Sequence, residues 1–275
     1  MNILIGTDAS VVTDKGLIRL NNEDNFYLNG SYMLEEEMNN GIRLSKQERC
    51  KEFIYAVCDG MGGEEAGEKA SFTVVSELKK FHGGVFSHAS IHDHKALATL
   101  VNTFIRNVNS LINDISEQNG YSLGTTFTSL ILYNNLAVAL NLGDSRVYLF
   151  RDGNLKKLTT DHTEAERLVR LGALTGEQAL KHKSRHMLYR YLGTAPDSGH
   201  PEAEASEAVE IQQGDAFLLC SDGLTDMVDE NRITEIFSAD STSMDISDAL
   251  LAEAIKNGGA DNITAMTIKI QGFGS

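Results

Sequence analysis

The sequence predicts an α+β fold in which mostly antiparallel β-sheets are covered by helices. Three observations lead to this fold class. Short strand-like runs outnumber helical segments, two pairs of these runs are separated by hairpin-like turns, and two long stretches carry apolar residues at helical spacing. Because a hairpin joins antiparallel neighbours directly, we expect the sheets to be mostly antiparallel.

The first third of the chain is expected to alternate strands and turns. Apolar runs at residues 3–5, 26–28 and 53–58 predict three strands, and the last of them ends at Asp59. The intervening residues 30–51 are polar and rich in charged side chains. We therefore interpret residues 30–51 as a surface insertion.

Two helices are expected next. Small and apolar residues recur every four positions from Ala66 to Leu78, and a continuous apolar stripe runs from Leu97 to Ile115. We interpret both stripes as faces that pack in the core, because an amphipathic helix buries its apolar side.

Two hairpins are expected in the middle of the chain. One spans residues 127–142 around Tyr133-Asn134-Asn135, and the other spans residues 147–158 around Asp152-Gly153, which is a strong two-residue hairpin signal. Asp144 therefore falls in the turn between two strands, where its side chain can face a cleft.

The chain then loses its strand pattern. Residues 159–190 are polar, with short helical pieces at 164–171 and 176–181, so we expect a flap over the edge of a sheet. The last expected elements are a strand at 217–220, a helix at 246–255 and a strand at 266–270.

Acidic residues lie at five places where a strand-like run meets a turn. These places are Glu23-Asp24, Asp59-Gly60, Asp144-Ser145-Arg146, Asp222-Gly223 and Asp261-Asn262. Carboxylates that a fold brings together bind hard divalent cations, which prefer oxygen ligands. Arg19 lies four residues before Glu23, and its planar guanidinium could hold a phosphate. The combination indicates metal-assisted phosphoryl chemistry.

These residues also resemble the motifs of a known family. In this order they are similar to the signature set of the metal-dependent protein phosphatases (the PPM family, type 2C serine/threonine phosphatases), in the bacterial form with a single catalytic domain. An Asp-Gly pair alone is usually only a turn, whereas the complete ordered set is specific. The matching segments are residues 16–24, 56–63, 124–126, 141–146, 160–162, 220–224 and 261–263, within a similarity that spans residues 11–270.

The resemblance implies a four-layer α-β-β-α sandwich and one catalytic domain over residues 1–275. It also implies a centre of two Mn²⁺ or Mg²⁺ ions. Asp59, Asp222 and Asp261 are the expected primary ligands. Asp59 would bridge both ions, and the Gly60 carbonyl would complete one coordination shell.

The resemblance implies roles for four further residues. Glu23 and Asp24 match outer acids that reach the metals directly or through water. Asp144 matches a residue that binds, together with Asp222, a third and weaker ion in microbial members. Arg19 matches the clamp for the substrate phosphate, for which lysine is a poor substitute. The structural alternatives are a charged strand edge for the two outer acids, a turn former for Asp144 and a solvated side chain for Arg19.

The implied reaction is hydrolysis of phosphoserine and phosphothreonine in the protein targets of serine/threonine kinases by a metal-activated water. Animal members carry a histidine, thought to protonate the leaving alcohol, where this chain has Met61. A metal-bound water or His162 could donate that proton instead. The alternative function is a weakly active or inactive regulatory module, which loss of a metal ligand would mark. No primary ligand is missing.

Composition limits the expected partners. The formal net charge of -15 argues against a nucleic-acid ligand, whose phosphates attract Lys and Arg. No apolar run approaches the length of a membrane span, and the N-terminus does not resemble a signal peptide. Cys50, Cys58 and Cys220 form no C-x-x-C pair, which fits a reducing compartment. We expect a monomeric cytoplasmic signalling enzyme that binds no membrane.

Overall fold

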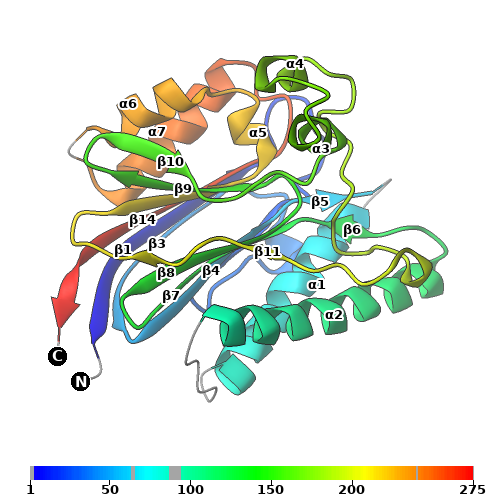
Figure 1. The fold of residues 1–275 in the computed structure, drawn as a ribbon, viewed down its shortest axis with the longest axis horizontal. Coiled ribbons are helices and arrows are strands. Elements are labelled where there is room, and N and C mark those ends of the chain that lie inside the picture. The colour runs from blue at the N-terminus through cyan, green and yellow to red at the C-terminus, as the bar shows by residue number, and fades with distance from the viewer. Residues whose placement is uncertain (1–2, 63–65, 87–93, 240, 275) are drawn as a thin grey trace.

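Two large antiparallel sheets pack face to face, with helices on both outer faces (Figure 1). The computed structural model describes residues 3–62, 66–86, 94–239 and 241–274. The first sheet contains, in spatial order, β10 (Asn154–Lys157), β9 (Arg146–Arg151), β13 (Ala216–Cys220), β14 (Ile263–Gly274), β1 (Leu4–Asp14) and β3 (Ile42–Cys50). The second contains β11 (Glu204–Ala205), β8 (Leu136–Leu142), β7 (Phe127–Tyr133), β4 (Glu52–Cys58) and β2 (Asn25–Leu28), and β12 (Val209–Glu210) also pairs with β8.

Helices form the two outer layers, so the predicted four-layer sandwich is confirmed. α1 (Ala66–Phe81) and α2 (His94–Asn119) cover the second sheet and are the two helices expected from the apolar stripes. α6 (Glu230–Phe237) and α7 (Ser243–Lys256) cover the first sheet. The remaining elements are α3 (Glu164–Arg170), α4 (Gly176–Leu180), α5 (Asp222–Thr225), a π-helical turn (His82–Phe86), two 3₁₀ turns (Glu35–Glu37 and Pro196–Ser198), and the short strands β5 (Gly60–Met61) and β6 (Gly124–Thr125).

β4 and β13 carry buried apolar residues at successive positions because their two faces pack into different apolar layers. In β4, Phe53 packs between the sheets, whereas Ile54 packs under α1 and α2. In β13, Phe217 packs between the sheets and Leu218 packs under α6 and α7. Full burial of a side chain of this size contributes about 1.5–3 kcal/mol. Three apolar layers therefore hold the four structural layers together.

The two predicted hairpins are confirmed, and their turns have the conformation that their sequences favour. Asn134 and Asn135 join β7 to β8 with φ angles of 47° and 63°. Asp152 and Gly153 join β9 to β10 with φ angles of 51° and 76°. Positive φ at both central residues matches the twist of antiparallel strands. The β8–β9 connection that carries Asp144 thus lies between two well-defined hairpins.

The surface-insertion interpretation of residues 30–51 requires correction, because Met33 and Met38 are buried in the core and the second half of the segment is a strand. Residues 42–50 form the edge strand β3, which pairs with β1 along its whole length. Its side chains alternate between half-buried and exposed, and Ile42 and Leu44 pack against the core. A polar edge strand has little apolar signal of its own. It forms because the long strand β1 offers its backbone.

β1 is also longer than the strand predicted at residues 3–5, because part of it is both polar and buried. The Asp8 carboxylate accepts hydrogen bonds from the backbone and hydroxyl of Ser243 at the start of α7. Ser10 shares a hydrogen bond with Ser247 on the same helix. These polar contacts attach α7 to the sheet. The polar residues that make them also interrupt the hydrophobic pattern by which the strand would be recognised.

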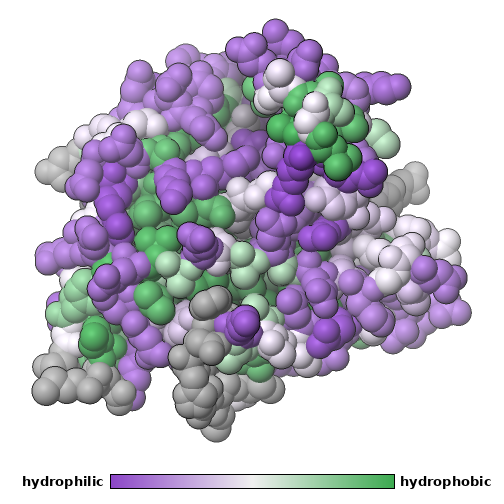
Figure 2. All heavy atoms as spheres, viewed as in Figure 1, coloured by the Kyte–Doolittle hydropathy of each residue, from purple (hydrophilic) through white to green (hydrophobic). Residues whose placement is uncertain are grey.

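The segment predicted as a flap, residues 159–190, contains the two expected short helices, α3 and α4. Thr163 and Thr175 cap them by accepting hydrogen bonds from backbone N–H groups. Hydrophobic residues gather on the visible face in the middle, over the sheets, and also near α3 and α4, where Leu171 and Leu180 are exposed (Figure 2). Among the helices of the described residues, none is long and apolar enough to cross a membrane.

Candidate metal and phosphate site

Residues from distant segments converge at one edge of the two sheets. Seven of the eight residues predicted for the site line one cavity of 660 Å³. Asp59 follows β4, Asp144 lies between β8 and β9, Asp222 begins α5 after β13, and Asp261 lies just before β14. The seven residues are Arg19, Glu23, Asp59, Gly60, Asp144, Asp222 and Asp261.

Asp59 lies at the centre of this arrangement, and the Gly124-Thr125-Thr126 motif fixes its backbone. Its N–H donates to Thr126 Oγ1 at 2.9 Å. Its carbonyl accepts the Thr126 N–H at 2.9 Å and the Thr125 hydroxyl at 2.9 Å. Burial, reinforced by the charges of neighbouring aspartates, raises the pKa of the Asp59 carboxyl well above its usual range. A divalent cation would remove this repulsion.

Two glycines at the site allow a backbone approach that no other residue permits. A Cβ on Gly60 would lie 2.3 Å from the carbonyl oxygen of Gly67 and 2.5 Å from that of Glu23. A Cβ on Gly223 would lie 2.0 Å from the carbonyl oxygen of Asn262. The glycines after Asp59 and Asp222 therefore keep the acidic segments in close contact.

Asp24 is the one predicted site residue that does not line the cavity. Its side chain is fully buried, and its Oδ2 accepts hydrogen bonds of 2.7 Å from Ser221 Oγ and from Thr264 Oγ1. Within the described part of the chain, its Oδ1 is buried without a hydrogen-bond partner. Burial raises the Asp24 pKa to about 7, although the two hydroxyls oppose this rise. An unpartnered carboxylate oxygen among other acids is a fitting donor for a hard cation.

Arg19 forms an ion pair with Asp261 in the cavity. Its Nη2 lies 2.7 Å from Asp261 Oδ2. Asn262 holds the neighbouring loop, because its Oδ1 accepts the Glu23 N–H at 2.8 Å and its Nδ2 donates to the Asn21 carbonyl at 2.8 Å. Sequence reasoning treated Asn262 only as a turn residue. In the structure it connects the Arg19 segment to the Asp261 segment.

Two residues of the cavity were missed by the sequence analysis. His186, in the flap segment, places Nδ1 3.5 Å from Asp222 Oδ2 and Nε2 3.5 Å from Asp226 Oδ2. The hydrogen bond and charge of Asp222 raise the pKa of His186. Burial opposes ionisation of Asp222, but His186, together with the Asp59 hydrogen bond and the Arg146 charge, lowers the Asp222 pKa. Asp226 could have been noticed from its spacing four residues after Asp222, on one helical face.

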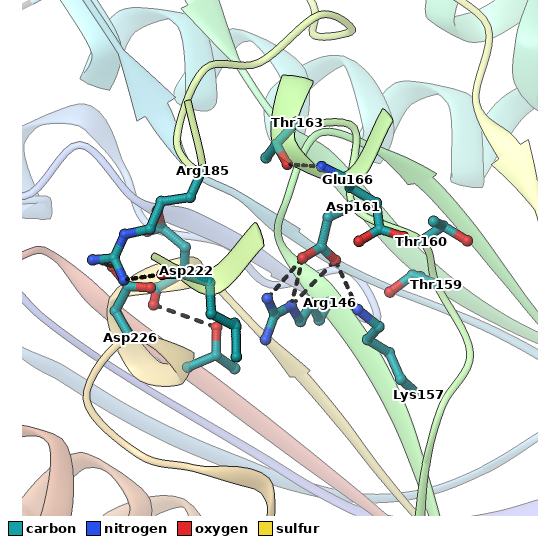
Figure 3. Close-up of polar contacts among 12 residues, drawn as sticks. Arg146, Lys157, Thr159, Thr160, Asp161, Thr163, Glu166, Arg185, Asp222 and Asp226 are labelled. Carbon is teal, nitrogen blue, oxygen red and sulfur yellow. Dashed lines mark hydrogen bonds and ion pairs between the residues drawn. The ribbon is translucent and has the colours of Figure 1, made fainter. Parts of the chain in front are cut away.

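The base of the flap is held by a buried ion pair. The Arg146 guanidinium contacts Asp161 through Nε and Nη2, the latter at 2.7 Å, and Lys157 approaches the same carboxylate at 3.3 Å (Figure 3). On the other side of this close-up, Arg185 reaches toward Asp226 at 3.6 Å. The charges of Arg146 and Asp161 thus largely neutralise each other.

His162, one of the proton donors that the sequence left open, is not placed to reach a substrate in the cavity. It is fully buried and lies outside the cavity lining. Its Nδ1 accepts the Gly143 N–H at 3.2 Å, so its Nε2–H faces Glu204 Oε2 at 3.3 Å. Burial lowers its pKa. His162 instead supports the turn that carries Asp144.

Known proteins share this sequence pattern and this fold. A family model described as Protein phosphatase 2C matches residues 21–263. The serine/threonine phosphatase stp of Listeria monocytogenes serotype 4b is 32% identical over 263 residues, which cover 95% of each chain. A solved S. agalactiae serine/threonine phosphatase has a TM-score of 0.80 and 25% identity, covering 96% of this chain and 100% of that one. The catalytic domain of the phosphatase PstP, solved with two manganese ions, has a TM-score of 0.76 and 29% identity, covering 98% and 100%.

Proposed function

Because this chain belongs to the protein phosphatase 2C family and is a metal-dependent protein serine/threonine phosphatase, we propose roles for the residues of its cavity. Asp59, Asp222 and Asp261, with the Gly60 carbonyl, hold two Mn²⁺ or Mg²⁺ ions. Glu23 and Asp24 act as outer acids. One observation carries this proposal: carboxylates from separate segments converge where burial and mutual repulsion raise the Asp59 pKa.

The chain's own residues then bind and orient the phosphate. Two divalent ions in such a centre lower the pKa of a water and hold it in line with phosphorus. Arg19 turns from Asp261 to the phosphate oxygens, which accept its two parallel N–H groups. Met61 lines the cavity but cannot donate a proton, and His162 is buried elsewhere. A water in the cavity would therefore supply the proton for the departing serine or threonine oxygen.

We extend the proposal to the biological setting. The chain forms one catalytic domain over residues 1–275, works as a monomer in the cytoplasm and reverses the action of a serine/threonine kinase in signalling. The free thiols of Cys50, Cys58 and Cys220 support a reducing compartment. The net charge of -15 supports protein rather than nucleic-acid substrates.

Replacing Arg19 with lysine tests the phosphate clamp. Lysine keeps the charge but loses the bidentate grip, so kcat/KM for a phosphothreonine peptide should fall about 10- to 100-fold, mainly through KM. Arg43→Lys is the matched control, because Arg43 pairs with Asp248 on the exposed surface and lies outside the cavity. An unchanged KM in Arg19→Lys would contradict the proposed role of Arg19 in substrate binding.

Metal addition and removal test the proposed ligands. Hydrolysis of the same peptide should require Mn²⁺, stop with a chelator and be nearly absent in Asp222→Asn at any Mn²⁺ concentration. The neutral amide binds a hard cation more weakly than a carboxylate does. Full Mn²⁺-dependent turnover by Asp222→Asn would contradict its role as a ligand. A folded wild-type protein without turnover would instead favour the inactive regulatory module.

A further inference from the structure

The loop that carries Arg19 exposes a contiguous apolar surface. Leu17, Ile18 and Leu20 are 63%, 69% and 87% exposed. Single exposed hydrophobic residues are common on protein surfaces and need no explanation. Here, however, three of the nine large hydrophobic side chains that are exposed in the described parts of the chain lie within four consecutive positions. They flank, on both sides, the arginine proposed to bind the substrate phosphate.

Hydrogen bonds to the backbone hold this loop in place. Asn262 Nδ2 donates to the carbonyl oxygens of Lys15 at 3.1 Å and of Asn21 at 2.8 Å, one on each side of the apolar residues. The Leu17 N–H donates to the Gly259 carbonyl at 2.7 Å. The loop is therefore anchored through its backbone, while its large apolar side chains remain in contact with water.

The apolar surface continues from the loop to the wall of the cavity. A Cβ on Gly259 would lie 3.3 Å from Leu17 Cγ and 3.1 Å from Ile255 Cδ1, so the turn after α7 packs against both side chains. A Cβ on the preceding Gly258 would lie 3.8 Å from Met227 Sδ. Met227 also lines the cavity. Apolar and glycine residues thus connect the exposed loop to the cavity.

The position of this surface favours the substrate as its occupant. A phosphate bound by Arg19 brings the substrate residues next to the phosphorylated serine or threonine close to the same loop, because an extended chain advances only about 3.4 Å per residue. Ile18 and Leu20 are the chain neighbours of Arg19, so substrate residues one or two positions from the phosphoresidue can reach them. A second copy of the chain on this surface would instead lie against Arg19 and obstruct the phosphate site.

We propose that Leu17, Ile18 and Leu20 form an apolar platform for hydrophobic substrate residues one or two positions from the phosphoresidue. The inference rests on the proposed phosphate-binding role of Arg19. It adds a substrate class, namely phosphoproteins with an apolar segment around the phosphorylated residue. Contact with such a segment removes the platform from water, which favours binding. The contact is the same before and during the reaction, so the preference should appear mainly in KM.

Two phosphothreonine peptides test the apolar platform in the full chain with Mn²⁺. One peptide carries leucine at the two positions on each side of the phosphothreonine, and the other carries serine at these positions. The wild type should hydrolyse the leucine peptide with a kcat/KM about 10-fold higher or more. In the double variant Ile18→Ser, Leu20→Ser this ratio should fall to about 2 or less. Because the ratio compares two peptides on the same enzyme, a general change in activity cancels.

Leu171→Ser is the matched control, because Leu171 is also 69% exposed but lies in the flap and outside the cavity lining. It should keep the wild-type ratio. A wild-type ratio near 1, with hydrolysis of both peptides, would overturn the apolar platform alone. No turnover of either peptide would overturn the proposed function as well. Sedimentation should show monomers throughout. A wild-type dimer that the double variant no longer forms would assign this surface to a second copy and overturn the inference.

Discussion

Replacing Asp59 with asparagine should reduce kcat/KM for a phosphothreonine peptide by about 10³-fold or more. A metal centre contributes several kcal/mol to transition-state stabilisation, and each 1.4 kcal/mol corresponds to about tenfold in rate. Asp59 is the residue proposed to bridge both ions, and its backbone is fixed by the Thr125 and Thr126 contacts. Asparagine keeps the side-chain shape but removes the bridging charge.

The same substitution should not damage the fold. Without metal, Asp59 is crowded by other carboxylates that raise its pKa, so the neutral asparagine should increase the Tm of the chelated protein. Asp152→Asn is the matched control, because Asp152 lies in the exposed β9–β10 turn, where asparagine also accepts a positive φ. Its kinetics should equal those of the wild type. Asp59→Asn with more than about a tenth of wild-type kcat/KM would exclude a bridging role.

Asp24 should make the metal-free protein less stable as the pH rises. Its folded-state pKa is about 7, against an ordinary value of 3.8. Because the folded state binds the proton more tightly than the unfolded state, this stabilisation is complete below about pH 4 and is lost as the pH rises through 7. At about 1.4 kcal/mol per pKa unit, the loss is on the order of 4 kcal/mol. The raised pKa values of Asp59 and Asp144 act in the same direction.

Asp24→Asn should remove this penalty. The amide oxygen can still accept hydrogen bonds from Ser221 and Thr264, and no charge is buried. In the chelated protein at pH 8, we expect a Tm about 5 °C or more above the wild type, and at pH 5 a much smaller difference. With Mn²⁺ the order should reverse, because ligand binding stabilises only the folded state and the variant binds it less well. Thermal unfolding at both pH values, with and without Mn²⁺, checks this. A lower Tm for chelated Asp24→Asn at pH 8 would contradict the buried charge.

The sequence is sufficient to predict most of the residues that line the candidate cavity, because they occur in local motifs. Asp59 and Asp222 each follow an apolar strand and precede a glycine. This pattern can be recognised without knowledge of the fold. The hairpin turn at Asn134-Asn135 is equally local, since both residues accept positive φ. Features of this kind depend on neighbours in the chain, so sequence reasoning reaches them.

Features that depend on distant partners were missed for a physical reason. The polar part of β1 is buried only because Asp8 and Ser10 bind Ser243 and Ser247 on α7. β3 forms only because β1 offers it a backbone edge. The unpartnered oxygen of Asp24 became visible only with three-dimensional contacts. None of these contacts leaves a pattern in neighbouring residues.

His186 illustrates the same limit at the functional site. It lies in the flap, between residues that carry no other metal-binding signal, and it meets Asp222 and Asp226 only in the folded chain. His162 shows the converse limit, because its residue type alone made it a possible proton donor. In the structure that histidine is buried and supports the Gly143 backbone. Burial and partners, rather than residue type, separate the two histidines.

The most direct test of the account is a crystal structure of the protein grown with Mn²⁺, with manganese located by anomalous scattering. We predict two strong peaks about 3.5–4 Å apart, with Asp59 between them and Asp222 and Asp261 on either side. A weaker third peak should lie beside Asp144 and Asp222, the residues that the family resemblance assigns to a third ion. Manganese bound away from Asp59, or a single ion without a neighbour, would contradict the binuclear centre on which the proposed mechanism depends.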